Sequence, residues 1–297
     1  MKFGSVDNPE AIDFALPVDH VDTAGILSKG TQSAEVPVYI GCAKWNRQDL
    51  KNFYPRGTKD ELAYYGQQFN SIELNATFYN NYTKEQVEKW RDKTPDGFMF
   101  FPKVNQMISH LKRLNDVTIY TEEFCDMARA FYPKLGMCFL QLHNNFGPKN
   151  FDRLEKYLSE FPEDVPLAVE LRNTAWFTDE EVAGQVYSLF EKHNITNIIT
   201  DTAGRRDLLH MRLTTPTAFV RYVGANHESD YSRLDDWIER IKSWMDQGLE
   251  KLYFFVHQNH EKESPLLSAY LIERLNKDLG FKLRMPIARP GQGTLTF

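Results

Sequence analysis

Short apolar segments recur along the chain and alternate with polar stretches that show helical spacing. The apolar segments are rich in residues that favour strands. On this pattern we predict eight strands, at residues 36–41, 71–75, 98–103, 135–142, 167–171, 197–201, 219–223 and 251–256.

The second of these segments, NSIELNATFY at 70–79, runs from a short strand directly into a polar, aromatic turn. Because side chains alternate across a strand, Ser71, Glu73 and Asn75 share one face. Burying an unpaired carboxylate on such a strand costs roughly several kcal/mol. Glu73 therefore needs a partner or a chemical role.

Helical stripes fill most of the gaps, as with Leu234, Trp237, Ile241 and Trp244. Three Thr-x-x-Glu/Gln sequences resemble capping boxes at helix starts. They are Thr58 with Glu61, Thr83 with Gln86, and Thr178 with Glu181. The link at 202–216 shows no convincing long helix, which leaves open a degenerate unit there.

Strands that alternate with helices indicate an α/β fold with a parallel sheet. Eight such units predict a single closed (β/α)8 barrel of the TIM type over residues 36–280. We expect an irregular extension at 1–35 and an irregular tail at 281–297. An open doubly wound sheet is the alternative, which the absence of Gly-x-Gly-x-x-Gly after the first strand disfavours.

Composition narrows the class of protein. The 297 residues are 42% hydrophobic, enough for a large core, and carry a net charge of −6. A chain with a net negative charge has no overall positive potential that would attract nucleic acid or anionic membrane surfaces. Three cysteines without metal-ligand spacing, and no signal peptide or long apolar run, favour a reducing cytoplasm. We expect the cysteines to be buried, with a reactive Cys42 left open.

Charged residues gather where the predicted strands end, which is the working face of such a barrel. Acids and bases on one rim drive pKa values apart, as catalytic sites require. Structural ion pairs are the competing interpretation, for example Glu170 with Arg172. The candidate catalytic residues are Glu73, Glu170, Asp201 and Lys103. The candidate substrate-binding residues are Arg172, Arg221, Asn75, Tyr79, His110, Gln141 and Asn259, with walls or a lid from Trp45, Tyr79 and Trp176.

No motif for an organic cofactor is present, and there is neither a P-loop nor a Gly-x-Ser-x-Gly elbow. The scattered oxygen and imidazole groups of Glu73, Glu170, Asp201, His143 and His257 leave a divalent metal open, although no spacing typical of a metal site occurs.

Several strings in order, including IGCAKWNRQDLKNFYP, NSIELNATFY, LAVELRNTAWF and FVRYVG, resemble the YecE-like family, also called domain of unknown function 72. The resemblance covers roughly residues 38–275 and implies a (β/α) barrel, but no established reaction. By matching motifs, the resemblance implies that these residues line the pocket: Glu73, Asn75, Thr77, Tyr79, Lys103, His110, Glu170, Arg172 and Arg221. The histidine of the family's R-x-H-G motif on strand seven is absent here, and His227 and His257 are the candidates to replace it.

Three functions follow, in order of preference. The first is an enzyme acting on a small, polar, anionic substrate, with Glu73 or Glu170 as general acid or base at a raised pKa. The second is a nucleic-acid-processing protein of the metal-dependent nuclease type, an analogy of fold alone. The third is a binding barrel without turnover. The oligomeric state is not predicted.

Overall fold

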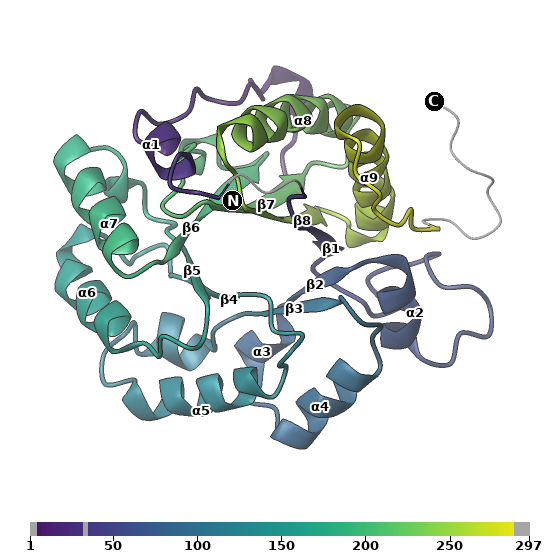
Figure 1. Ribbon diagram of the computed structural model, residues 1–297, viewed down its shortest axis with the longest axis horizontal. Coiled ribbons are helices and arrows are strands. Elements are labelled where there is room, and N and C mark those ends of the chain that lie inside the picture. The colour runs from purple at the N-terminus through teal and green to yellow at the C-terminus, as the bar shows by residue number, and fades with distance from the viewer. Residues whose placement is uncertain (1–4, 32–34, 288–297) are drawn as a thin grey trace.

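The computed structural model describes residues 5–31 and 35–287. Figure 1 shows the strands arranged around one centre, with the helices outside them. The strands are β1 Val38–Cys42, β2 Ser71–Leu74, β3 Met99–Pro102, β4 Cys138–Gln141, β5 Leu167–Glu170, β6 Thr196–Thr202, β7 Thr217–Gly224 and β8 Lys251–Gln258. Each falls at a predicted segment, with ends that differ by up to three residues.

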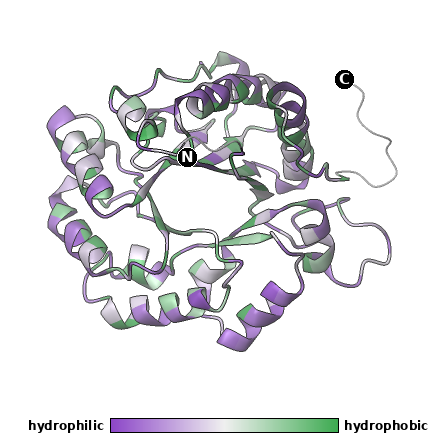
Figure 2. Cartoon of the chain, in the orientation of Figure 1, coloured by the Kyte–Doolittle hydropathy of each residue, from purple (hydrophilic) through white to green (hydrophobic). Residues whose placement is uncertain are grey.

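The longer helices connect successive strands and expose their polar faces, as the colouring of Figure 2 shows. The α-helices are α1 Thr23–Leu27, α2 Glu61–Gln68, α3 Ala76–Tyr79, α4 Lys84–Asp92, α5 Thr118–Arg129, α6 Phe151–Glu160, α7 Glu180–Lys192, α8 Ser229–Gln247 and α9 Ser264–Leu279. Between β6 and β7 the one helical element is the short turn Arg206–Leu208, where the sequence lacks a helical stripe.

Two of the three predicted helix caps are wrong by one or two residues. Asp60, not Thr58, accepts from the Ala63 amide at 3.0 Å, and Asp179, not Thr178, caps α7. Thr83 caps α4 as predicted, accepting from the Gln86 amide at 3.3 Å. A carboxylate beside a threonine takes the cap because its negative charge also favours the positive end of the helix.

The parallel strands form two ladders, a six-stranded sheet in the order β1-β8-β7-β6-β5-β4 and a two-stranded sheet of β2 and β3. The architecture is therefore an α/β, barrel-like fold, a coarser result than the predicted continuous ring of eight strands. The first strand nevertheless pairs with the last, from Val38 opposite Leu252 to Cys42 opposite Val256.

Side chains bridge the seam between β1 and β2. The Asn70 amide accepts from the Ile40 N–H and donates to the Val38 carbonyl, and the Tyr65 hydroxyl links the Cys42 N–H to the Ser71 carbonyl. The strands come so close that a Cβ on Gly41 would lie 2.2 Å from the Ser71 carbonyl oxygen. Only glycine fits there, which accounts for its position in the first strand.

Isolated bridges close the seam between β3 and β4, pairing Phe100 with Leu135 and Lys103 with Phe139. Strands of both ladders also share one inner apolar layer. Its members are Phe101, Phe139, Ala168, Ile198, Phe219, Tyr253 and Phe255. This layer fills the centre of the fold below the carboxyl ends of the strands, and the side chains at those ends lie above it.

Candidate functional site

A cluster of buried charges lies directly above the inner apolar layer. Arg221 on β7 donates from Nε and Nη2 to the two carboxylate oxygens of Glu73 on β2, at 2.8 and 2.7 Å. Its Nη1 donates to Glu170, the last residue of β5. All three side chains are at most 5% exposed. Arg221 therefore joins the two-stranded and six-stranded ladders through one guanidinium.

The network continues from Glu170 to a lysine. Gln141 at the end of β4 donates to Glu170 at 3.0 Å, and Lys103 donates from Nζ to the Gln141 amide oxygen at 2.9 Å. Arg172 donates from Nε to the other oxygen of Glu170 at 2.5 Å. Lys103 thus meets the carboxylates only through a neutral amide in these contacts.

On the opposite side, His257 of β8 lies with its Nε2 3.0 Å from Glu73, and Asn75 donates to the same carboxylate at 2.8 Å. The His257 Nδ1 lies 3.6 Å from Glu261. Of the two histidines considered as replacements for the missing family histidine, His257 is the one in the cluster. His227 instead contacts Ser229 at 3.0 Å.

Both carboxyl groups are held ionised. Burial would raise their pKa values, but Arg221 and His257 hold the pKa of Glu73 well below its usual range, and Arg172 and Arg221 do the same for Glu170. The prediction that either glutamate has a raised pKa is therefore wrong. The cations in direct contact outweigh the effect of burial.

The pKa values of the nitrogen bases shift in both directions. Burial, followed by the charges of Arg221 and Arg172, lowers the pKa of Lys103 to about 7. Burial would lower the pKa of His257, but the Glu73 charge overrides it and raises that pKa to about 9. Burial and the nearby Lys103 lower the pKa of His110 to about 4. Lys103 is the member of this cluster whose pKa lies nearest neutrality.

A small pocket of about 140 Å³ opens beside Glu73. Its walls come from the loop after β1 and the turn after β2 and include Lys44, Trp45, Asn75 and Tyr79. Tyr79 is 64% exposed, whereas Trp45 packs edge-on against Trp90 at 5.5 Å. The polar, aromatic turn of the NSIELNATFY segment thus forms one wall of a recess next to the charges.

A family model described as "Protein of unknown function DUF72" matches residues 39–290. The chain belongs to the DUF72 family. The match includes every residue of the charged cluster.

Relatives of this DUF72 protein include the UPF0759 protein YecE of Escherichia coli K12, 26% identical over 82% of this chain and 94% of that protein. The UPF0759 protein YunF of Bacillus subtilis is 29% identical over 48% of this chain and 52% of its own.

Two crystal structures of DUF72 proteins share the fold. The protein from Thermotoga maritima has a TM-score of 0.68 at 24% identity, covering 81% of this chain and 99% of its own. The protein from Enterococcus faecalis has a TM-score of 0.67 at 19% identity, covering 80% and 95%. These similarities support the fold and assign no reaction.

Asp201 does not join the cluster of the DUF72 protein, contrary to the prediction. Ile198, three residues earlier on β6, packs in the inner layer. Because side chains alternate along a strand, Asp201 points outward, toward α8. There it accepts from Arg233 Nη2 at 2.7 Å and from Trp237 Nε1 at 2.8 Å, and it pairs with Arg206. Asp201 fastens α8 and the β6–β7 link to the sheet.

Two further predicted contacts lie elsewhere. Trp176 is fully buried, donates to the Phe146 carbonyl at 2.7 Å and stacks on that ring, so it is a core residue and not a lid. Asn259 is exposed, and its backbone N–H donates to the Gly224 carbonyl at 3.2 Å, away from the charged network.

The two remaining family positions support Lys103. Thr77 donates to the carbonyls of Leu74 and Lys103, at 3.0 and 2.8 Å, and so ties the backbone of Lys103 to the end of β2. His110 lies with its ring 4.9 Å from that of Phe78. Phe78 in turn lies under the Lys103 amine at 4.3 Å.

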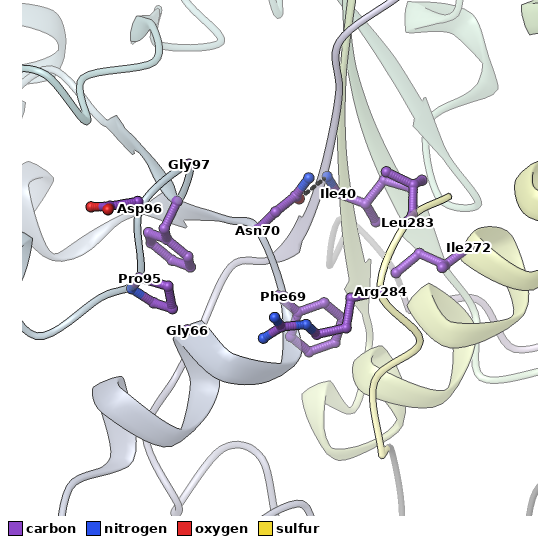
Figure 3. Close-up of a pocket in the computed structure, with 11 residues that line it drawn as sticks. Ile40, Gly66, Phe69, Asn70, Pro95, Asp96, Gly97, Ile272, Leu283 and Arg284 are labelled. Atoms are coloured by element: carbon purple, nitrogen blue, oxygen red, sulfur yellow. Dashed lines mark hydrogen bonds between the residues drawn. The ribbon is translucent and has the colours of Figure 1, made fainter. Parts of the chain in front are cut away.

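A second pocket, of about 210 Å³, lies between α2, α9 and the segment after α9 (Figure 3). Asn70 and Gly97 line it where β2 and β3 begin, so it opens toward the amino ends of these strands. It is separate from the charged cluster, which occupies their carboxyl ends.

The sequence also left open a reactive Cys42 and a divalent metal ion. Cys42 is fully buried, and burial raises the pKa of its thiol to about 12, which makes it unreactive. Within residues 5–31 and 35–287, no three His, Cys, Asp or Glu side chains are placed to hold a metal ion, and no helix is long and apolar enough to cross a membrane.

The carboxylates make the stability of the protein sensitive to acid. Their folded pKa values lie below the unfolded value of about 4.3, so the stability they contribute is present above that pH and is lost as the pH falls below it. We expect the Glu170→Gln variant to lose less unfolding free energy than wild type between pH 5 and pH 3, by up to about 1.4 kcal/mol per pH unit. Urea unfolding at the two pH values measures this.

Glu160→Gln is the matched control, because Glu160 is 55% exposed and lies 3.9 Å from Lys156. It should keep the wild-type dependence on pH. If Glu170→Gln also kept it, Glu170 would not be ionised in the folded protein.

Proposed function

We propose that this DUF72 protein is an enzyme that binds a small anionic substrate at the carboxyl ends of its strands and transfers a proton there. Lys103 in its neutral form is the base, and Arg172 contacts the anion. One observation carries the proposal. Arg221 uses its donors on Glu73 and Glu170, which leaves a buried lysine beside the network with a neutral amide as its acceptor.

The charge balance supports an anionic substrate. Glu73, Glu170 and Glu261 are matched by Arg221, Arg172 and His257, with His257 protonated at neutral pH. A proton that Lys103 takes up from the substrate then adds one positive charge in excess. The carboxylate or phosphate of the bound substrate balances that charge in a low-dielectric setting, where the attraction is strong.

The proposal includes a scaffold in which the eight strands form one closed (β/α)8 barrel. Pairing of β1 with β8 and the hydrogen-bonded seams on either side of the β2–β3 ladder favour this closed arrangement. Residues from several strands then reach one rim, as in enzymes with this fold. The metal-dependent nuclease alternative gains no matching ligand set in the described residues.

The test is a screen of phosphate monoesters and short carboxylic acids by thermal shift, followed by NMR detection of product. We expect Arg172→Met to weaken binding of the best ligand about 10- to 100-fold, because a charge-assisted hydrogen bond is worth about 1.5–3 kcal/mol. Arg172→Lys should retain part of the affinity.

Arg91→Met is the control, since Arg91 has similar exposure, 25% against 18%, and bonds to the Ala130 carbonyl on the outer helices. Equal affinity in wild type and Arg172→Met would refute the role of Arg172. Binding without product for every ligand would favour a binding barrel.

A further inference from the structure

The surroundings of Lys103 differ from those of the other lysines. It is 8% exposed and is the one lysine among the buried residues of the described chain. Lysines that form ion pairs, such as Lys44 and Lys93, keep 41% and 48% of their side chains exposed. For Lys103 no carboxylate lies within ion-pair distance among the described residues, and Gln141 is its hydrogen-bond acceptor.

Aromatic rings enclose the amine. Lys103 Nζ lies 4.3 Å from the centroid of Phe78 and 5.9 Å from that of Phe139. Two guanidinium groups, Arg221 and Arg172, are held in the same network through Glu170. Burial and two nearby guanidinium charges favour the neutral form of an amine, and a neutral lysine amine is a nucleophile toward carbonyl carbon.

We infer that Lys103 is a nucleophile that forms a covalent imine with the carbonyl carbon of a small substrate carrying a carboxylate or phosphate group. This inference rests on the proposed function, because the same anion site must hold the substrate. Arg172 would hold the anionic group while the carbonyl faces Nζ.

The chemistry needs no further reagent. The neutral amine attacks, the N–C bond forms and the C=O π bond breaks, and the oxygen becomes a hydroxyl by taking one proton. The oxygen then leaves as water after a second proton transfer. One of the two protons comes from the amine and one from solution, so the product is a protonated imine and water. Its positive charge lies in the network that contains Glu170 and Glu73, which stabilises it.

Reductive trapping tests the inference on the full chain. The protein is incubated with pyruvate, glyoxylate or dihydroxyacetone phosphate in cyanoborohydride, which reduces imines, and labelled peptides are mapped by mass spectrometry. We expect labelling of Lys103 at least tenfold above that of any other lysine. The carboxylate and phosphate probes separate the two classes of anion, and acetone serves as the neutral probe.

Two variants complete the design. Lys103→Arg should remove the label while keeping a long basic side chain, and Arg172→Met should reduce it at least tenfold. Lys134→Arg is the control, because Lys134 is also partly buried but donates to the Arg91 and Thr94 carbonyls near the amino ends of the strands. It should leave labelling of Lys103 unchanged.

The failures are distinguishable. If these anions shift the melting temperature in an Arg172-dependent way but Lys103 is labelled no more than surface lysines, the imine is refuted and the proposed function stands. If there is neither a shift nor a label, both are refuted. Equal labelling by acetone would refute the anionic substrate class alone.

Discussion

Replacing Arg221 by Met is expected to lower the free energy of unfolding by about 3–5 kcal/mol. The substitution keeps most of the side-chain volume but leaves Glu73 and Glu170 buried without the cation that both contact. It also removes the link between the two ladders. Urea unfolding followed by circular dichroism at pH 7 measures the loss.

Two further variants separate charge from packing. Arg129→Met removes an arginine whose pair with Asp164 is exposed, and should cost less than about 1 kcal/mol. Adding Glu73→Gln to Arg221→Met should recover part of the lost stability, because one of the unpaired charges is then absent. A loss no larger than that of Arg129→Met would show that Arg221 does not support the fold.

The second large effect concerns activity. On a substrate found by the anion screen, Lys103→Met is expected to reduce kcat/KM by roughly 10²- to 10⁴-fold, the range for a group that transfers protons. In wild type, kcat/KM should rise with pH through about 7, as the Lys103 amine loses its proton. Arg221 and Arg172 hold that pKa down, while Glu170 and Glu73 oppose them.

The same substitution should leave the stability unchanged or increase it. A lowered pKa means that the folded protein holds the charged amine at a cost below the unfolded pKa of about 10.4, and Met removes this cost. Lys134→Met should show the opposite pattern, a loss of stability without a change in kcat/KM, because its bonds to backbone carbonyls are structural. A parallel loss of stability and activity in Lys103→Met would make Lys103 a structural residue.

The charged cluster shows where interpretation of the sequence succeeds. Glu73, Lys103, Gln141, Glu170 and Arg221 each lie at or near the end of a predicted strand, and the structure brings all five into one network. Strand ends can be located from the apolar pattern. Parallel strands place those ends on the same side, so the gathering follows from topology.

Two of the three misplaced residues, Asp201 and Trp176, show why the rest could not be predicted. β6 is buried along its whole length, so its composition does not reveal which face is inward. Asp201 lies one position from the inward face and therefore meets α8. Trp176 is equally ambiguous, since an aromatic residue after a strand can cover a site or fill the core beneath it.

By itself the sequence determined the order of strands and helices, the α/β class and the set of charged residues near the site, because these depend on local pattern and on connections along the chain. Only the tertiary structure decided which charges meet. The pKa of a buried group depends on its nearest partners, and these come from strands far apart in sequence: Glu73 and Arg221 are separated by 148 residues. For this reason the glutamates are held ionised by arginine and histidine, and our proposal assigns the acid–base role to Lys103 instead.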